Sequence, residues 1–427
     1  MSLSGGVRPI PRLDSWDSSL ALLADPYRFI DRHCTELGTD VFETRLMLQR
    51  TLCMRGVRAA ELFYDTARFQ RAGAAPEPLR ATLFGKGAVQ GLDGEAHRRR
   101  KSLFTGTLGA DAVGRLGERV RREWEAALPG WERAGSISLY RAVQPVLTQA
   151  VCDWAGVPLA AESLPRRTAQ LTALFDFAAS GARRHLRARV ARMQAEAWIA
   201  GLVRDARAHR GVFTPGSAAD RVAAHRDADG ELLAPRVAAV ELINILRPTV
   251  AVSVYIVFVA HALHAHPAWR AILAQPGTSA EALAFTQEVR RHYPFFPATV
   301  AKVRHAFDWN GMHFPKGRRT MLDLHGTNHD PLAWPDPHTF SPRRWSGRAP
   351  GRFDFVPQGG GDAATHHRCP GEDVATRLML LALQMLLTRM EYRVAARSSE
   401  IDMRRLPALP RDGFVIENVR RAPSSRY

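Results

Sequence analysis

The longest apolar stretch of the chain spans residues 239–263 and reads AVELINILRPTVAVSVYIVFVAHAL. A membrane-spanning helix needs about 20 apolar residues without charge. Here Arg247 and Pro248 interrupt the run and Glu241 opens it. We therefore expect a long helix that is buried on every side inside a large soluble protein.

Arg247 is the unusual residue of this stretch. A buried guanidinium without a partner costs several kcal/mol, so an anionic group must meet it. An internal salt bridge to an Asp or Glu is one interpretation. The other is a bound carboxylate, because Pro248 lacks a backbone N–H, kinks the helix and opens space beside five N–H donors. The stretch alone leaves both interpretations open.

The remaining pattern is mostly helical, and strand-like pieces are confined to 40–56, 298–325 and the tail from 392 to 420. No internal repeat and no low-complexity linker divides the chain. We expect a mainly α fold with a small β portion, in one domain over 1–427 that begins with a loose arm over 1–20. The predicted helices cover 20–37, 57–66, 94–105, 110–128, 140–154, 163–178, 185–208, 235–265, 279–293 and 371–391.

Charge and cysteine usage exclude several classes of protein. The net charge is +17, but only four of the 59 basic residues are lysine and the arginines are spread along the chain. They form no stripe interleaved with aromatic residues, so we expect no nucleic-acid partner. The four cysteines show no paired spacing, which excludes a disulfide framework and a zinc site. Without an apolar N-terminal signal region, we expect a cytoplasmic protein.

A glycine-rich segment, FDFVPQGGGDAATHHRCPGE over 353–372, presents one thiol, Cys369, just before the predicted helix over 371–391. Free N–H groups and the dipole at a helix N-terminus favour a thiolate. Glycines allow a flat ligand to approach the backbone. A structural cysteine after a flexible loop is the alternative. A phosphate-binding loop is disfavoured, because no Gly-Lys-Ser/Thr follows.

Two further motifs precede this loop. Glu288 and Arg291 are three residues apart on one face of a predicted helix and can pair. The segment FSPRRW over 340–345 follows, and its Arg344 completes a predicted buried Glu–Arg–Arg cluster.

In this order, the motifs resemble the cytochromes P450 over essentially the whole chain. They are the Glu-x-x-Arg helix, the Phe-x-Pro-x-Arg-aromatic segment at 340–345 and Cys-x-Gly at Cys369 and Gly371. The resemblance implies the cytochrome P450 fold. It also implies haem b with the Cys369 thiolate as the axial iron ligand.

Two departures resemble the fatty-acid peroxygenase branch of P450s. Ordinary P450 monooxygenases carry an acid–alcohol pair in the long central helix, where residues 244–248 read NILRP. The cysteine loop is also longer than usual. Similarity to the branch extends over ELINILRP, QEVRRHYPFFP, LDLHGTNHDP and FVPQGGGD. In that branch hydrogen peroxide replaces dioxygen, NAD(P)H and the reductase, so no redox partner protein is expected.

The resemblance then implies roles for single residues. Arg247 would bind the carboxylate of a long-chain fatty acid, and that carboxylate would serve as general acid–base. Pro248 would shape the space beside it. Gln90 occupies a position that carries Gln or His in the branch, where Gln accompanies hydroxylation and His accompanies decarboxylation. We predict hydroxylation at the α-carbon, with the β-carbon as the second candidate.

Other candidates concern the haem and the acyl chain. His97, Lys101 and Arg71 could reach the haem propionates; a solvated basic helix face is the alternative. Four apolar residues could line an acyl channel or simply belong to the core: Leu83, Phe84, Phe295 and Phe296.

Three rival functions remain. The first is a decarboxylating peroxygenase that makes terminal alkenes, and the second is a redox-partner-dependent P450 monooxygenase. The third is a haem-binding sensor or carrier without turnover. Stable membrane insertion is not expected for any of them.

Overall fold

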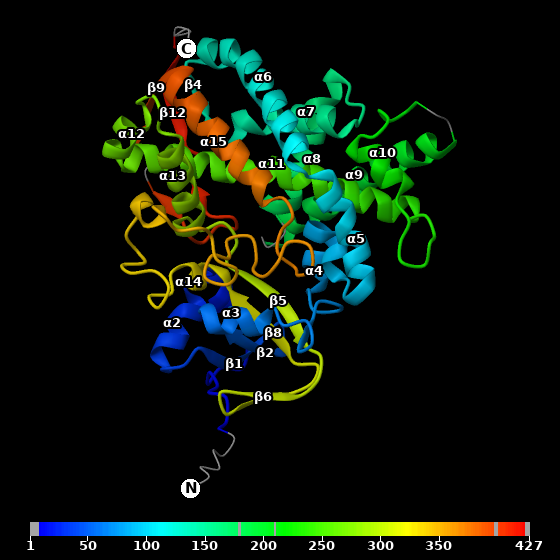
Figure 1. Ribbon diagram of the computed structural model, residues 1–427, viewed down its shortest axis with the longest axis vertical. Helices are drawn as coiled ribbons and strands as arrows, with labels where there is room; N and C mark the ends of the chain where they lie inside the picture. The colour runs from blue at the N-terminus through cyan, green and yellow to red at the C-terminus, as the bar shows by residue number, and fades with distance from the viewer. Residues whose placement is uncertain (1–7, 178–180, 209–210, 397–399, 423–427) are drawn as a thin grey trace.

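The computed structural model describes residues 8–177, 181–208, 211–396 and 400–422. Figure 1 shows a mainly helical body with a small sheet region at its lower end. This agrees with the predicted mainly α fold. The helices are α1 Ser19–Ala24, α2 Phe29–Glu36, α3 Val57–Phe63, α4 Glu77–Leu79, α5 Gly94–Thr107, α6 Ala110–Ala134, α7 Leu139–Ala155, α8 Leu164–Asp176, α9 Ala182–Ala208, α10 Ala218–Ala224, α11 Pro235–Ala265, α12 Pro267–Leu273, α13 Ser279–His292, α14 Leu324–Asn328 and α15 Glu372–Thr388.

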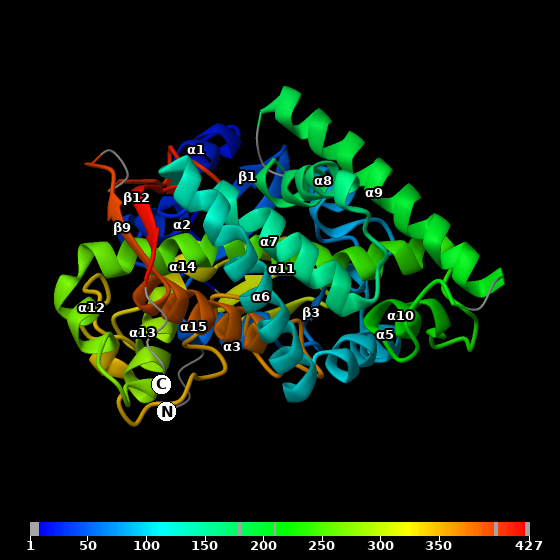
Figure 2. The same cartoon turned by 90° about the horizontal axis from the view of Figure 1, so that it is seen from above.

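Helix α11 passes through the middle of the molecule and packs against α7, α8, α9 and α15 (Figure 2). Among the described residues it is the one helix long and apolar enough to cross a membrane, yet 94% of its most apolar window is buried in the protein. The helix runs through Pro248 without a break. Its bounds are those that the sequence predicts.

The larger sheet has five strands in the order β1-β2-β8-β5-β3. Strands β2 and β8 are parallel, with Thr51 opposite Arg319, and β5 is antiparallel to β8, with Lys302 opposite Arg319. The two-residue turn between β1 and β2 has positive φ at Met47 and Leu48, as a tight hairpin requires. The strands are β1 Val41–Leu46, β2 Gln49–Met54, β3 Phe69–Gln70, β4 Ser136–Ser138, β5 Ala298–Val303, β6 Phe307–Trp309, β7 Met312–Phe314, β8 Arg319–Asp323, β9 Met390–Val394, β10 Ile401–Asp402, β11 Leu409–Pro410 and β12 Val415–Arg421.

The helix expected over 20–37 is two helices, because Pro26 donates no N–H and disfavours helical backbone at the preceding residue. Four short helices were not predicted: α4, α12, α14 and α10. Of these, α10 begins with a capping serine. Its first turn is stabilised by the Ser217 hydroxyl, which accepts a hydrogen bond from the N–H of Asp220 at 3.3 Å.

Glu288 joins α13 to the segment that precedes the cysteine loop. Both of its oxygens accept hydrogen bonds from Arg291, at 2.7 and 2.8 Å, and Nε of Arg344 donates to it at 3.1 Å. The indole N–H of Trp345 donates at 3.0 Å. Glu288 and Arg291 are fully buried. The structure thus brings together the three residues of the predicted cluster.

We expect Glu288→Ala to lower the free energy of unfolding by about 3–5 kcal/mol, because it leaves Arg291 buried without its counter-ion. Urea denaturation followed by circular dichroism measures this. Glu118→Ala is the matched control: its pair with Arg121 is exposed and contributes less than about 1 kcal/mol. Equal losses in the two variants would contradict the role given to Glu288.

A group of histidine rings lies beside this cluster. The rings of His325 and His329 are 4.3 Å apart, and His329 also stacks on His338 at 5.2 Å. Burial, aided by the positive charge of Arg291, lowers the pKa of His292 and of His329 to about 3. These two rings are therefore neutral in the folded protein at neutral pH.

We expect stability to fall as the pH drops from about 6.5 to about 3, because unfolded histidines bind protons near pH 6.5 and these folded ones do not. Each such histidine contributes a slope of about 1.4 kcal/mol per pH unit. His329→Phe should show a shallower slope in urea denaturation between these pH values. An unchanged slope in His329→Phe would refute the assignment.

Candidate active site

Cys369 lies directly before α15, which packs against α11. The backbone N–H of Gly371 donates to its Sγ at 3.4 Å. Burial nevertheless raises the pKa of the Cys369 thiol, and the Gly371 hydrogen bond and the charges of Lys101 and Arg290 only oppose that rise. The N–H at the start of α15 thus lowers the pKa of Cys369, as predicted, but burial raises that pKa by more.

The cysteine loop is held by charged side chains on both sides. Nζ of Lys101 donates to the carbonyl oxygens of His366 and Arg368, at 2.9 and 2.6 Å. On the other side, Arg290 and Arg368 both bond to Glu372, at 2.8 and 2.9 Å. These contacts fix the backbone that presents Cys369.

His97 and Lys101 are buried, each 4% exposed, which removes the alternative of a solvated basic face. His97 stacks on His367 with ring centroids 4.0 Å apart. Burial lowers the pKa of His97 to about 4 and that of Lys101 to about 8. Arg71 is also buried, with its guanidinium 4.4 Å above the Phe63 ring. Its positive charge helps to lower the pKa of both His97 and Lys101, so the structure brings the three candidates together.

This set of residues fits a haem. Cys369 offers a single soft sulfur ligand without any other metal-binding cluster among the described residues. The three buried basic groups beside the loop, Arg71, His97 and Lys101, suit the two propionates. These residues would hold the haem.

Arg247 is buried, 6% exposed, and faces no carboxylate in the described part of the chain. Its Nη2 donates to Oδ1 of Asn244 at 3.4 Å, and its Nε has no hydrogen-bond partner there. Burial and the charge of Arg192 lower its pKa to about 9, whereas Cys369 acts in the opposite direction. Within the described chain, Arg247 therefore does not form the internal salt bridge that the sequence left open. Its charge interacts with that of Cys369, which indicates that the two residues belong to one site.

Glu241 organises the residues around Arg247, and the sequence did not single it out for this role. Its Oε1 accepts hydrogen bonds from Arg100 at 2.6 Å and from the N–H of Val89 at 2.8 Å. Its Oε2 accepts one from Asn244 at 3.1 Å, and Asn244 also donates to Oε1 of Gln90 at 3.4 Å. Gln90 is thus turned toward α11. The spacing of three between positions 241, 244 and 247 was the available signal, since it places them on one helix face.

The four apolar candidates belong to the main core. Leu83 and Phe295 are buried in it, and Phe84 and Phe296 pack against it. Phe295 stacks on Tyr255 of α11, with ring centroids 4.3 Å apart. Their role in an acyl channel stays a prediction.

Comparison with known proteins identifies the family. The model for cytochrome P450 matches residues 283–417, which contain Glu288, Arg344 and Cys369. A point variant of cytochrome P450SP alpha (CYP152B1) is 49% identical over 95% of this chain and 99% of that chain, with a TM-score of 0.93. The chain belongs to the cytochrome P450 family. Its predicted fold and family are confirmed.

Other P450 relatives define its place in the family. Cytochrome P450EX alpha (CYP152N1), solved with myristic acid, is 39% identical over 97% of this chain and 100% of that one, with a TM-score of 0.93. CYP152B1 has also been solved in complex with (R)-ibuprophen. Cytochrome P450 716A75 of Maesa lanceolata is 30% identical over 129 residues, which are 30% of this chain and 26% of that protein. The chain thus matches about a quarter of the length of such curated relatives. It is a P450 enzyme closely related to the CYP152 peroxygenases.

We expect Cys369→Ala to abolish the thiolate-type absorption band of the reduced, CO-bound protein, because the other three cysteines lie in α2, β2 and α7. Cys152→Ala, which alters a cysteine buried in α7, should retain that band. Difference spectroscopy on the haem-loaded variants measures both. Retention of the band in Cys369→Ala would mean that another residue ligates the iron.

Proposed function

We propose that this P450 uses H2O2 to hydroxylate long-chain fatty acids at the α-carbon, and that Arg247 binds the substrate carboxylate. The observation that carries the proposal is the buried Arg247 guanidinium, which has no carboxylate partner in the described chain. A buried charge without a counter-ion costs several kcal/mol. A ligand carboxylate would remove that cost with charge-assisted hydrogen bonds.

The relatives support a carboxylic acid as the ligand. CYP152N1 binds myristic acid, and CYP152B1 binds (R)-ibuprophen, which also carries a carboxyl group. The apolar residues on both sides of Arg247 in α11, and the core that holds Leu83 and Phe295, suit a hydrocarbon chain.

The carboxylate of the substrate itself would relay the proton that peroxide chemistry requires. Positions 244–248 of α11 carry no acid, and Glu241 is occupied by Arg100, Val89 and Asn244. An oxygen of the carboxylate bound at Arg247 would accept a proton from peroxide and return it. The bound haem would supply the oxidising chemistry. Since this route needs no acid–alcohol pair, we infer that no reductase partner is required.

Gln90 bears on the choice of product. It contacts Asn244, which in turn contacts Arg247, so it stands next to the group that would hold the carboxyl end. In the branch that the sequence resembles, Gln at this position accompanies hydroxylation and His accompanies decarboxylation, which supports hydroxylation here. The carboxyl anchor favours attack at the α-carbon, followed by the β-carbon. We place the enzyme in the cytoplasm, where its four unpaired cysteines suit a reducing environment.

We expect Arg247→Ala to lower kcat/KM for myristic acid and H2O2 by at least about 30-fold, because the substrate loses a buried charge partner worth about 2 kcal/mol or more. Haem content and the CO-bound spectrum should not change. Arg115→Ala, an exposed arginine on α6, is the control and should retain wild-type activity. Wild-type activity in Arg247→Ala would refute the carboxylate site.

Mass spectrometry of the wild-type products decides among the candidate functions. 2-Hydroxymyristic acid made with H2O2 alone is the expected result, and 3-hydroxymyristic acid would move the attack to the β-carbon. Tridecene would instead indicate the decarboxylating peroxygenase. Turnover only with a reductase and NAD(P)H would indicate a monooxygenase. Haem bleaching under peroxide without any product would indicate a sensor or carrier.

A further inference from the structure

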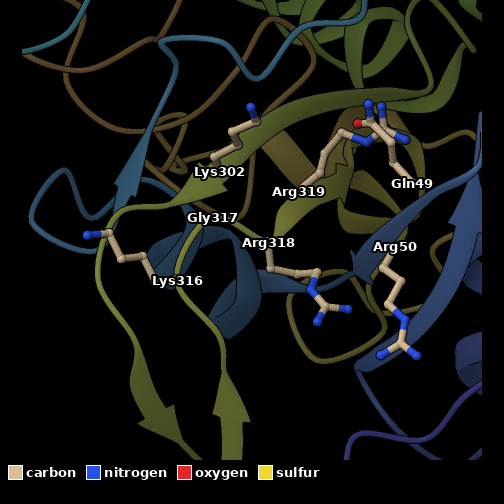
Figure 3. A pocket seen from close by; sticks show the side chains of 7 residues that line it. All are labelled: Gln49, Arg50, Lys302, Lys316, Gly317, Arg318 and Arg319. Carbon is tan, nitrogen blue, oxygen red and sulfur yellow. The ribbon is translucent and has the colours of Figure 1, made fainter.

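A cluster of basic side chains lines a cleft at one end of the five-stranded sheet (Figure 3). Gln49 and Gly317 also line this cleft, which lies far from α11. We call the following residues the basic cluster: Arg50, Lys302, Lys316, Arg318 and Arg319. Three neighbouring strands bring them together, because Arg319 on β8 lies opposite Lys302 on β5 and Arg318 and Arg319 follow the turn after β7.

Few carboxylates neutralise this cluster. Glu43 pairs with Arg50 at 3.7 Å and with Arg318, and it is shared with Arg12 at 3.1 Å. Within the described residues, Lys302 and Lys316 form no ion pair with any carboxylate. Arg319 bonds instead to the Thr51 hydroxyl and the Leu46 carbonyl. The Asp17 carboxylate also acts on the charge of Arg319. Two carboxylates, Glu43 and Asp17, thus face the five cations, and the cleft keeps a net positive charge.

Exposed apolar side chains lie next to the basic cluster. They come from α1, from the residues before it and from the turn between β1 and β2. We call this set the apolar edge: Trp16, Leu20, Leu23, Met47 and Leu48, which are 74%, 82%, 51%, 52% and 64% exposed. Large apolar groups that are exposed together commonly mark an interaction surface.

Hydrogen bonds hold the apolar edge in one piece. The N–H of Met47 donates to the Ser19 hydroxyl at 2.6 Å, and the N–H of Leu48 donates to Asp17 at 2.6 Å. The edge continues directly into the basic cluster, because Gln49 and Arg50 follow Leu48 in the chain and Arg319 bonds to Leu46. One surface thus offers apolar side chains and cations side by side.

We propose that this surface docks the protein on an anionic lipid bilayer. Exposed Trp and Leu side chains would enter the boundary between headgroups and acyl chains, and the basic cluster would pair with phosphate groups. A nucleic acid fits less well, because four of the five apolar side chains are aliphatic and cannot stack on bases. The attachment is peripheral, since the long apolar helix α11 is buried inside the protein.

Docking at a bilayer does not depend on the proposed activity, so the two can fail separately. Co-sedimentation of the full-length protein with vesicles measures docking without any turnover. We expect binding to vesicles of phosphatidylcholine mixed with phosphatidylglycerol, and much weaker binding to phosphatidylcholine alone. Absence of binding to the anionic vesicles would overturn the proposal.

The basic cluster is tested by Lys302→Gln combined with Lys316→Gln. Loss of two basic groups near an anionic surface should weaken vesicle binding about 30-fold. Arg115→Gln combined with Arg122→Gln removes the same charge from exposed positions on α6, outside the five-stranded sheet. Equal weakening by this control would mean that only the net charge matters, which would also overturn the proposal.

The apolar edge is tested by Leu20→Ser combined with Leu48→Ser, which should weaken binding at least about tenfold through lost burial of two side chains. The matched control is Leu283→Ser combined with Leu332→Ser, whose leucines are 44% and 82% exposed on other surfaces. Unchanged binding in the Leu20 and Leu48 variant would refute the apolar contact. Activity on myristic acid in solution should not change in either variant.

Discussion

The burial of α11 is the constraint on which the rest of this structure depends. A helix that is apolar on all faces must be covered on all faces, and α7, α8, α9 and α15 do this. The same packing brings the N-terminus of α15, with Cys369, toward the middle of α11. An arginine in that middle is then removed from water together with the apolar residues around it.

Arg247 differs from the other buried arginines of the described chain, which each bond to a carboxylate or to a backbone carbonyl. Glu288 holds Arg291 and Arg344, Glu241 holds Arg100, and Glu196 holds Arg192. The bonds from Glu288 to Arg344 and from Glu241 to Arg100 join different elements of the fold, whereas Arg291 and Arg192 pair within their own helices. Arg247 has only the amide oxygen of Asn244 and an unpartnered Nε. Among the buried arginines of the described chain, Arg247 is thus the one that bonds to an amide oxygen alone, which leaves it available for a ligand carboxylate.

Positive charge has different effects at Arg247 and in the basic cluster. Around Arg247, burial raises the free-energy cost of an unpaired charge, so binding of an anion that pairs with Arg247 is favoured. At the sheet end, Lys302 and Lys316 stay in contact with water, and their effect is a long-range attraction that salt screens. The net charge of +17 sums buried and exposed charges and does not show which charges are buried.

The sequence by itself determined the mainly helical fold, the family and the two ends of the site. Cys369 and Arg247 could be found because each breaks a local pattern, a thiol in a glycine-rich loop and a charge in an apolar helix. The helix prediction did not allow for Pro26, which separates the predicted helix into α1 and α2. Only the tertiary structure decided that Arg247 has no carboxylate partner in the described chain, that Asn244 links Gln90 to α11, and that the apolar edge adjoins the basic cluster. Those facts depend on contacts between residues far apart in the chain, and local patterns carry no information about which side chains meet across such distances.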